Sequence, residues 1–210
     1  MSIKEALSIS KLTDFLYLGS FQACKNATKA GITHILNLSK EIDANLYDIY
    51  DIDVKNFQYR AVELADLPTE AISPCFDYCF AFIESARLSG GKVLVHCIAG
   101  VSRSATVCMA YLMKHRRLTL EEAYHLVKAR RPVVHPNPGF WKQLIQFEFV
   151  LYGTNTVESR PVSGLGIDYP SVCLPSIEKT IAPNFVWVFA KDFVIFFIMM
   201  ICDTFLISRR

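Results

Sequence analysis

The chain has no excess of charge of either sign, which removes the usual basis for binding a polyanion. Its 210 residues include 22 Lys and Arg against 20 Asp and Glu, a formal net charge of +2. We therefore expect no nucleic-acid partner. The length suits one domain, or one domain with an appendage, and the sequence contains no internal repeat.

The seven cysteines lack the spacing of a zinc site, and their number is odd. Cys75 and Cys79 lie four residues apart, but no second pair of Cys or His follows nearby. The first ten residues, MSIKEALSIS, lack an apolar run long enough for a secretory signal. These absences predict free thiols in a reducing compartment, with no metal ion and no cofactor. We expect a cytoplasmic protein whose cysteines are mostly small core residues.

Strand-like and helix-like segments alternate along the first 153 residues. The predicted strands are residues 14–21, 33–39, 56–64 and 92–96. The predicted helices are residues 20–31, 73–87, 104–113, 120–131 and 138–153, the fourth opened by a capping box at Thr119 and Glu122. This alternation predicts an α/β fold with a central, mostly parallel sheet flanked by helices. Sites in such folds lie at the carboxyl edge of the strands.

The composition changes after Gly153, so we predict three regions, with residues 1–153 as the folded domain. Residues 154–184 contain four Pro, four Ser and two Gly and are predicted to be a linker. Residues 185–210 form a hydrophobic tail, in which 19 of the 23 residues from Phe185 to Ile207 are apolar. Lys191, Asp192 and Asp203 interrupt this run. Two hypotheses stay open: membrane association, including that of mitochondria, or packing against the domain.

One stretch, GKVLVHCIAGVSRSATVCMAYLM (residues 91–113), places a loop of small residues between an apolar strand and an apolar helix. The helix is expected to begin at or just after Arg103, where its unpaired N–H groups and dipole attract anions. Small side chains let successive amides turn inward, and Gly100 permits backbone angles that other residues resist. We therefore predict a phosphate cradle formed by the loop residues Ile98, Ala99, Gly100, Val101, Ser102 and Arg103.

Cys97 lies at the base of this predicted cradle. The loop amides, the helix dipole and Arg103 favour its thiolate, which is the nucleophilic form of cysteine. Arg103 can hold two phosphate oxygens through its forked guanidinium. A cysteine between a strand and a helix is ordinarily a core residue, and an arginine at a helix start is ordinarily solvated. The two residues together, bracketing a small-residue loop, favour a catalytic function.

The segment VHCIAGVSRSA matches the His-Cys-x5-Arg-Ser signature, and the chain resembles the cysteine-based protein phosphatases. The segments LYLGS, AGITHILNLS, AGVSRSATVCMAYLM and RPVVHPNPGFWKQLIQFE resemble the small atypical dual-specificity phosphatases, over residues 10 to 153. The resemblance implies hydrolysis of phosphotyrosine, phosphoserine and phosphothreonine esters on proteins through a cysteinyl-phosphate. Cys97 would be the nucleophile and Arg103 the phosphate ligand.

The leaving alkoxide needs a proton, and the segment ELADLPTE offers Glu63, Asp66 and Glu70 as donors. Asp66, 31 residues before Cys97, matches the general acid of the family by position. Without the resemblance, an Asp ahead of Leu-Pro would be interpreted as a turn residue.

Three further residues are expected to support the reaction. By resemblance, Ser104 would donate its hydroxyl to the sulfur of Cys97, His96 would fix the loop and tune the thiol, and Asn137 would brace the loop. Each has an ordinary alternative: a first-turn residue for Ser104, a satisfied core histidine for His96, and a helix cap before Pro138 for Asn137.

The loop interior lacks lysine, whereas relatives that act on inositol lipids tend to carry basic residues there. This favours phosphoproteins as substrates. The alternatives are a non-catalytic phosphoprotein-binding module and a phosphatase of RNA 5′-ends or of lipids. The basic clusters Lys114–Arg117 and Lys128–Arg131 are predicted to complement helix dipoles, with nuclear import or docking as the weaker interpretation. The oligomeric state is not predicted.

Overall fold

The computed structural model describes residues 8–161 and 168–173. The chain divides into two compact units, Met1–Ser159 and Arg160–Arg210. The hydrophobic tail 185–210 and residues 174–184 of the predicted linker lie outside the described residues. Within the described ranges, no helix has the length and apolar character needed to cross a membrane.

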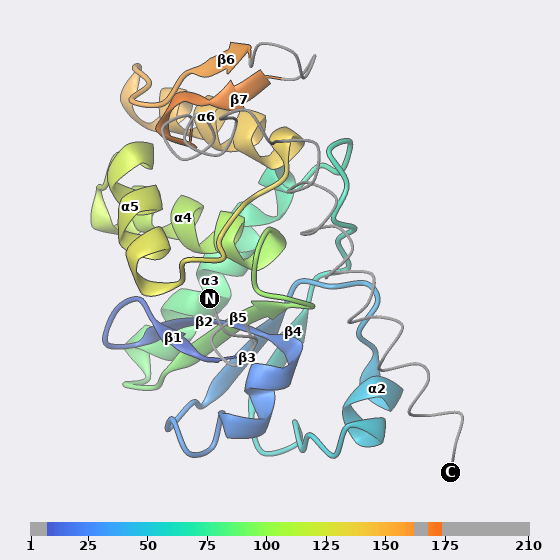
Figure 1. Ribbon diagram of the computed structural model, residues 1–210. Helices are drawn as coiled ribbons and strands as arrows, with labels where there is room; N and C mark the ends of the chain where they lie inside the picture. Colours follow the sequence, from blue (N-terminus) through green and yellow to red (C-terminus); the bar gives the residue numbers. More distant parts are fainter. Residues whose placement is uncertain (1–7, 162–167, 174–210) are drawn as a thin grey trace. The chain divides into compact units, whose positions relative to one another are not determined.

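The first unit is built on a five-stranded sheet in the order β1-β2-β5-β3-β4 (Figure 1). The strands are β1 (Ser10–Lys11), β2 (Leu16–Ser20), β3 (His34–Asn37), β4 (Gln58–Ala61) and β5 (Val93–Cys97). The strands β2, β5, β3 and β4 are parallel, and β1 pairs antiparallel with β2. Every residue of β2, β3 and β5 is buried, which fits strands covered on both faces.

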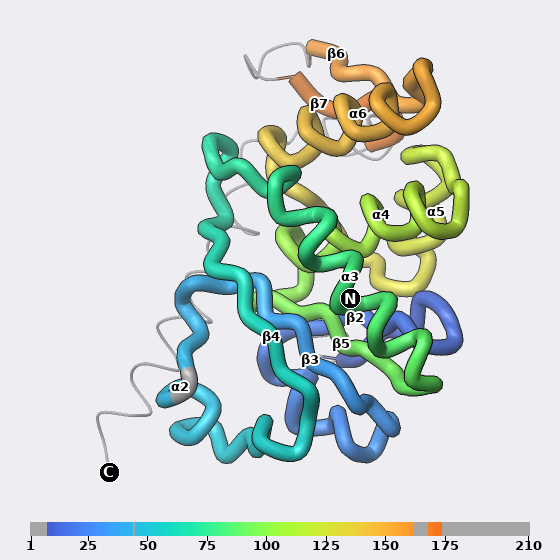
Figure 2. The backbone as a smooth tube through the Cα atoms, turned by 180° about the vertical axis from the view of Figure 1, so that it is seen from behind, coloured from blue at the N-terminus to red at the C-terminus, as the bar shows by residue number. Residues whose placement is uncertain are grey.

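Helices cover both faces of this sheet, as Figures 1 and 2 show from opposite sides. The first unit contains α2 (Ala44–Ile49), α3 (Phe76–Leu88), α4 (Arg103–Arg116), α5 (Leu120–Arg130), α6 (Pro138–Tyr152) and the 3₁₀ helices η1 (Phe21–Asn26) and η2 (Ser73–Cys75). The helices α3 and α4 lie on one face, and η1 and α2 lie on the other. The sequence-based prediction of a mostly parallel α/β fold is therefore confirmed.

The predicted helix ends follow local capping chemistry. Thr119 and Glu122 form the expected capping box at the start of α5. Asn137 caps α6 through a hydrogen bond from the amide of Phe140, and Pro138 occupies its first turn. The helix α4 is buried from Arg103 to Met113, as its nearly uniform apolar sequence predicts.

Several elements differ from the prediction. Residues 20–31 contain a short 3₁₀ helix, η1, instead of a longer helix. The helix α2 and the strand β1 were not predicted, because six and two residues are too few to show a period. The segment predicted to be a linker contains the paired strands β6 (Ser159–Pro161) and β7 (Asp168–Pro170) and the 3₁₀ helix η3 (Ser171–Cys173).

Candidate active site

The sulfur of Cys97 lies at the end of the central strand and receives two hydrogen bonds. The amide of Gly100 donates at 3.3 Å and the hydroxyl of Ser104 donates at 3.2 Å. Cys97 is only 2% exposed. Two hydrogen-bond donors therefore converge on the sulfur that the sequence predicts to be the nucleophile. The first turn of α4 therefore supplies the contact that the sequence predicted for Ser104.

The hydrogen bonds of the carbonyl groups show how the backbone of the Cys97–Arg103 loop is turned. Four of these carbonyls accept hydrogen bonds from outside: Ile98 from the Phe21 amide (3.0 Å), Ala99 and Gly100 from the Arg131 guanidinium (2.8 and 2.7 Å), and Val101 from the His135 amide (2.9 Å). In a trans peptide the N–H group points opposite to the C=O group. The amides that follow these carbonyls are thus directed inward, as the predicted cradle at residues 98–103 requires.

Gly100 makes this loop geometry feasible. Its φ angle is +67°, in the left-handed region that favours glycine. A Cβ atom at this position would lie 2.4 Å from the carbonyl oxygen of Gly19. Any side chain at Gly100 would therefore force the loop and strand β2 apart.

Arg103 opens α4 with a side chain that is 2% exposed. Its Nη1 donates to Oε2 of Glu41 at 2.6 Å and to the carbonyl of Leu64 at 2.8 Å. Its Nε is buried and has no hydrogen-bond partner among residues 8–161 and 168–173. Oδ2 of Asp66 is 3.7 Å from that Nε, too far for a hydrogen bond. A buried guanidinium N–H group that makes no hydrogen bond can donate one to an anionic ligand.

Asp66 is the carboxylate of the upstream loop that reaches the Cys97–Arg103 loop. Its Oδ1 accepts hydrogen bonds from the Ser102 hydroxyl at 2.7 Å and from Nδ2 of Asn137 at 2.9 Å. The other two candidates are placed differently, since Glu70 accepts from the amide of Ala65 and Glu63 is exposed. Asp66 is held by two donors and remains partly exposed, which suits a group that exchanges protons with a substrate and with water.

Asn137 performs both of the functions considered for it. Its backbone amide donates to the Ser102 hydroxyl at 3.1 Å, and its Nδ2 donates to Asp66. Its Oδ1 accepts from the Phe140 amide at the start of α6. One side chain therefore caps a helix and joins the loop to the candidate acid.

His96 is completely buried, and both of its ring nitrogens have partners. Its Nδ1 lies 3.2 Å from the carbonyl oxygen of Cys97, and its Nε2 lies 2.8 Å from the hydroxyl of Tyr47. Burial lowers the pKa of His96 to about 4, so the ring is neutral at pH 7. Because a carbonyl only accepts, Nδ1 carries the proton and Tyr47 donates to Nε2. Neither hydrogen bond reaches the thiol, so His96 acts on the loop by fixing its backbone.

Arg131 was not identified from the sequence as part of the site. Its cluster was expected to complement a helix dipole, but its side chain is 1% exposed. Its Nε and Nη2 donate to Gly100 and Ala99, and its Nη1 donates to the carbonyl of Ser8 at 2.9 Å. Burial lowers the pKa of Arg131 to about 10, which leaves it charged at pH 7. Only tertiary structure reveals this contact, because the loop lies about 30 residues upstream.

Glu41 was also missed, although the sequence contained one signal for it. It follows β3, and the carboxyl edge of a parallel sheet is where α/β proteins place their sites. Glu41 lies four residues beyond the end of that strand and reaches Arg103.

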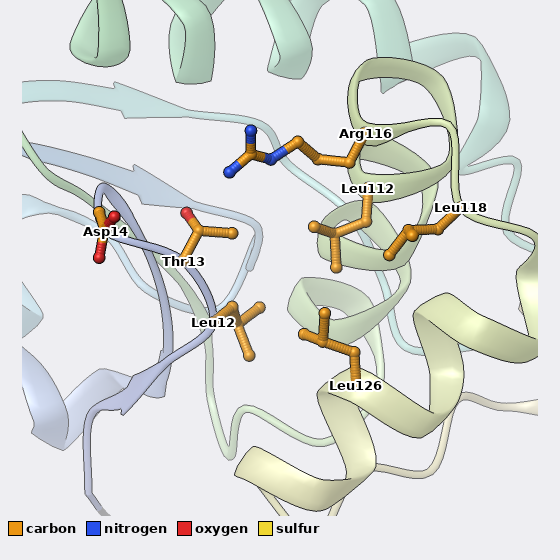
Figure 3. A pocket seen from close by; sticks show the side chains of 7 residues that line it. All are labelled: Leu12, Thr13, Asp14, Leu112, Arg116, Leu118 and Leu126. Carbon is orange, nitrogen blue, oxygen red and sulfur yellow. The ribbon is translucent and has the colours of Figure 1, made fainter.

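A separate pocket lies near the far end of α4 (Figure 3). Its volume is about 300 Å³, and its lining includes Leu12–Asp14, Leu112, Arg116, Leu118 and Leu126. Leu112 is nine residues from Arg103, about 14 Å along the helix, so this pocket is distinct from the candidate site. The part of the chain that the structure describes contains no cluster of three or more His, Cys, Asp or Glu arranged to hold a metal ion.

Comparison with known proteins agrees with this geometry. The model of the dual specificity phosphatase catalytic domain matches residues 16–149. Human dual specificity protein phosphatase 14 is 44% identical over 153 residues, which are 71% of this chain and 74% of that protein. Human dual specificity protein phosphatase 18 is 40% identical over 159 residues, 73% of this chain and 81% of that protein.

Solved structures of two human proteins are also similar. DUSP28 is 36% identical with a TM-score of 0.62, covering 68% of this chain and 94% of its own. A tyrosine phosphatase-like serine/threonine/tyrosine-interacting protein is 33% identical with a TM-score of 0.61, covering 68% of this chain and 97% of its own.

Proposed function

The chain belongs to the dual-specificity protein phosphatases, and from that premise we propose how its residues hydrolyse phosphate esters of proteins. It is a hydrolase of phosphoric monoesters on tyrosine, serine and threonine side chains. The proposal assigns catalytic roles to Cys97, Arg103, Asp66 and Ser104, and supporting roles to His96 and Asn137. Its main support is the Cys97–Arg103 loop, in which four carbonyls accept hydrogen bonds from outside while two donors converge on the sulfur of Cys97.

In the first step, the inward amides of residues 98–103 and the guanidinium of Arg103 bind the phosphoryl oxygens. The sulfur of Cys97 attacks phosphorus, a P–S bond forms, and the ester P–O bond breaks. Asp66 donates its proton to the departing oxygen. Positioning and charge stabilisation supply most of the rate enhancement in such a transfer.

In the second step, water attacks the cysteinyl-phosphate and Asp66, now ionised, takes a proton from that water. The P–S bond breaks and Cys97 leaves as a thiolate. The hydroxyl of Ser104, 3.2 Å from the sulfur, stabilises the developing charge. Inorganic phosphate then dissociates, and each step uses groups of this chain and water.

A phosphopeptide panel tests the assignment. Wild-type protein, Cys97→Ser and Asp66→Ala are compared on phosphotyrosine, phosphoserine and phosphothreonine peptides, with phosphoinositides and RNA 5′-phosphates as the competing classes. We expect peptide turnover that disappears in Cys97→Ser. Phosphopeptide binding without turnover would instead identify a non-catalytic binding module, and faster turnover of lipid or RNA would overturn the substrate class.

We also propose that residues 185–207 associate with a membrane, on the basis of their apolar sequence. Full-length protein and a chain truncated before Phe185 are expressed in cells, and membranes are washed with alkaline carbonate. The proposal is supported if the full-length chain stays in the washed membranes and the truncated chain does not. The membrane fraction that retains it, mitochondrial or other, identifies the membrane. Recovery of both forms in the cytoplasmic or nuclear fraction would contradict it.

A further inference from the structure

We propose that Glu41 is a positioning residue for the phosphatase reaction: it holds Arg103 so that the opposite edge of the guanidinium faces the phosphoryl group. The inference rests on the proposed function and adds a residue from outside the sequence signature. It is carried by the 2.6 Å contact between Oε2 of Glu41 and Nη1 of Arg103.

Glu41 is fixed in place by the backbone around it. The buried side chain of Asn37 accepts from the amide of Ser39 and donates to the carbonyl of Ile42, at 3.0 and 2.9 Å. The amide of Lys40 donates to the carbonyl of Leu64 at 3.3 Å. These bonds flank Glu41 on both sides, so its carboxylate meets Arg103 from a constrained segment.

The hydrogen bonds that described residues make to Arg103 all go to Nη1. The carboxylate of Glu41 accepts one hydrogen bond from Nη1, and the carbonyl of Leu64 accepts the other at 2.8 Å. Nε, on the opposite edge of the guanidinium, is buried, donates no hydrogen bond to the described residues, and lies 3.7 Å from Oδ2 of Asp66, the candidate acid. A phosphate bound in fork geometry accepts from two donors on one edge of the guanidinium, either Nε with Nη2 or the two terminal nitrogens. With Nη1 occupied by Glu41 and Leu64, the edge formed by Nε and Nη2 is the one left for the ligand.

Two roles of Glu41, repelling the phosphate by charge and orienting Arg103, can be distinguished, because they predict opposite changes in phosphate affinity when Glu41 is removed. A carboxylate close to an anion site repels the anion, so removing Glu41 should tighten phosphate binding if charge alone mattered. If Glu41 orients Arg103, its removal should weaken binding, because the freed guanidinium samples other rotamers. The two effects have opposite directions, and we expect orientation to prevail because the contact is short and Arg103 is buried.

The experiment measures the inhibition constant of orthovanadate and kcat/KM for p-nitrophenyl phosphate in Glu41→Ala, Glu41→Gln and Glu41→Asp. We expect Glu41→Ala to raise the vanadate constant and lower kcat/KM about ten-fold, the usual cost of a hydrogen bond to a charged group. Glu41→Gln should be intermediate, since its amide oxygen can still accept from Nη1. Glu41→Asp should recover part of the wild-type value.

Two controls separate positioning from a general structural effect. Glu63→Gln removes an exposed carboxylate of the same size and should leave the vanadate constant unchanged. The rate at which neutral iodoacetamide alkylates Cys97 should stay at the wild-type value in all Glu41 variants, because Glu41 makes no contact with the sulfur.

A vanadate constant that falls in Glu41→Ala would show that Glu41 competes with the substrate, and an unchanged constant would show no role; either result overturns the inference. A changed alkylation rate would assign the effect to loop structure and also overturn it. Wild-type protein and Cys97→Ser are assayed in parallel. If wild type shows no turnover that depends on Cys97, the proposed function itself fails, which is a distinguishable result.

Discussion

Two buried arginines lie on opposite sides of the Cys97–Arg103 loop, and they differ in how their donors are used. Arg131 binds the outer side, and its Nε, Nη1 and Nη2 all donate to backbone carbonyls. Arg103 belongs to the inner side, and within the described part of the chain its hydrogen bonds involve Nη1 only. Its Nε has no hydrogen bond there and lies 3.7 Å from the carboxylate of Asp66. The exposed fractions of the two arginines are nearly the same, 1% and 2%.

This difference separates an arginine that holds the backbone from one that is placed to bind a ligand. A buried charge is stable when its hydrogen bonds are satisfied, as in Arg131. A buried donor without a hydrogen bond destabilises the folded state, so its presence beside the sulfur of Cys97 indicates a site where a ligand completes the hydrogen bonding. Arg131 holds the carbonyls of Ala99 and Gly100 on the outer side of the loop. The amides that follow them point inward, where they can bind an anion together with Arg103.

The largest effect is expected for Arg103→Lys, because lysine cannot reproduce the fork. We expect kcat/KM to fall about 10³-fold, with a free energy of unfolding within about 1 kcal/mol of wild type. Steady-state kinetics and urea unfolding measure the two quantities, with the exposed Arg116→Lys as the matched control. Equal losses of activity in Arg103→Lys and Arg116→Lys would show that Arg103 has no special role in the reaction.

Arg131→Met should mainly reduce stability, since it leaves three backbone carbonyls without their donor. We expect the free energy of unfolding to fall by about 3–4 kcal/mol. Its neighbour Arg130 is exposed, so Arg130→Met removes the same charge without breaking these contacts. Urea unfolding of the two variants sharpens the comparison, and similar midpoints would contradict it.

His96 should make stability depend on pH below neutrality. Its folded-state pKa of about 4 lies below the ordinary value of 6.5, so the unfolded chain binds more protons between these values. The free energy of unfolding should therefore fall by on the order of 3 kcal/mol between about pH 7 and pH 4. NMR titration of the His96 ring checks the pKa directly, and a ring that protonates near the ordinary value would contradict the account.

Unfolding of His96→Asn should show a weaker pH dependence than wild type. The exposed His125→Asn is the control and should retain the wild-type slope. Equal slopes in all three proteins would assign the acid sensitivity to other groups.

Asp66→Asn should give a smaller kinetic effect than Arg103→Lys, and one that depends on the leaving group. We expect kcat/KM to fall about a hundred-fold for phosphoserine peptides, whose alkoxide needs the proton most. The loss should be smaller for p-nitrophenyl phosphate, whose leaving group is already stable as an anion. A loss that is the same on both substrates would argue against Asp66 as the acid, and Glu63→Gln serves as the control on the same loop.

The geometry of the Cys97–Arg103 loop could be predicted from the sequence because its determinants are local. Cys97, Gly100, Arg103 and Ser104 lie within eight residues, between a strand and a helix that their apolar patterns identify. The caps at Thr119 and Asn137 were predicted for the same reason, since a cap acts within one helical turn.

The remaining contacts depend on the tertiary structure. Tyr47 bonds to His96 from α2, a helix of six residues that shows no period, and the two lie 49 positions apart. Arg131 lies in a basic cluster, where solvent exposure is the ordinary expectation, yet the fold buries it against the loop. Glu41 reaches Arg103 across 62 positions. No local pattern encodes such pairs, because the sheet order brings them together.

The most direct test is to trap the phosphoryl group on Cys97. Wild-type protein and Asp66→Asn are mixed with a phosphotyrosyl peptide, quenched in acid within the first turnover, digested and analysed by mass spectrometry. The account predicts that the peptide containing Cys97 gains the mass of one phosphoryl group, with more of it in Asp66→Asn because hydrolysis of the intermediate is slower. Label on another residue, or turnover that persists undiminished in Cys97→Ser, would contradict it.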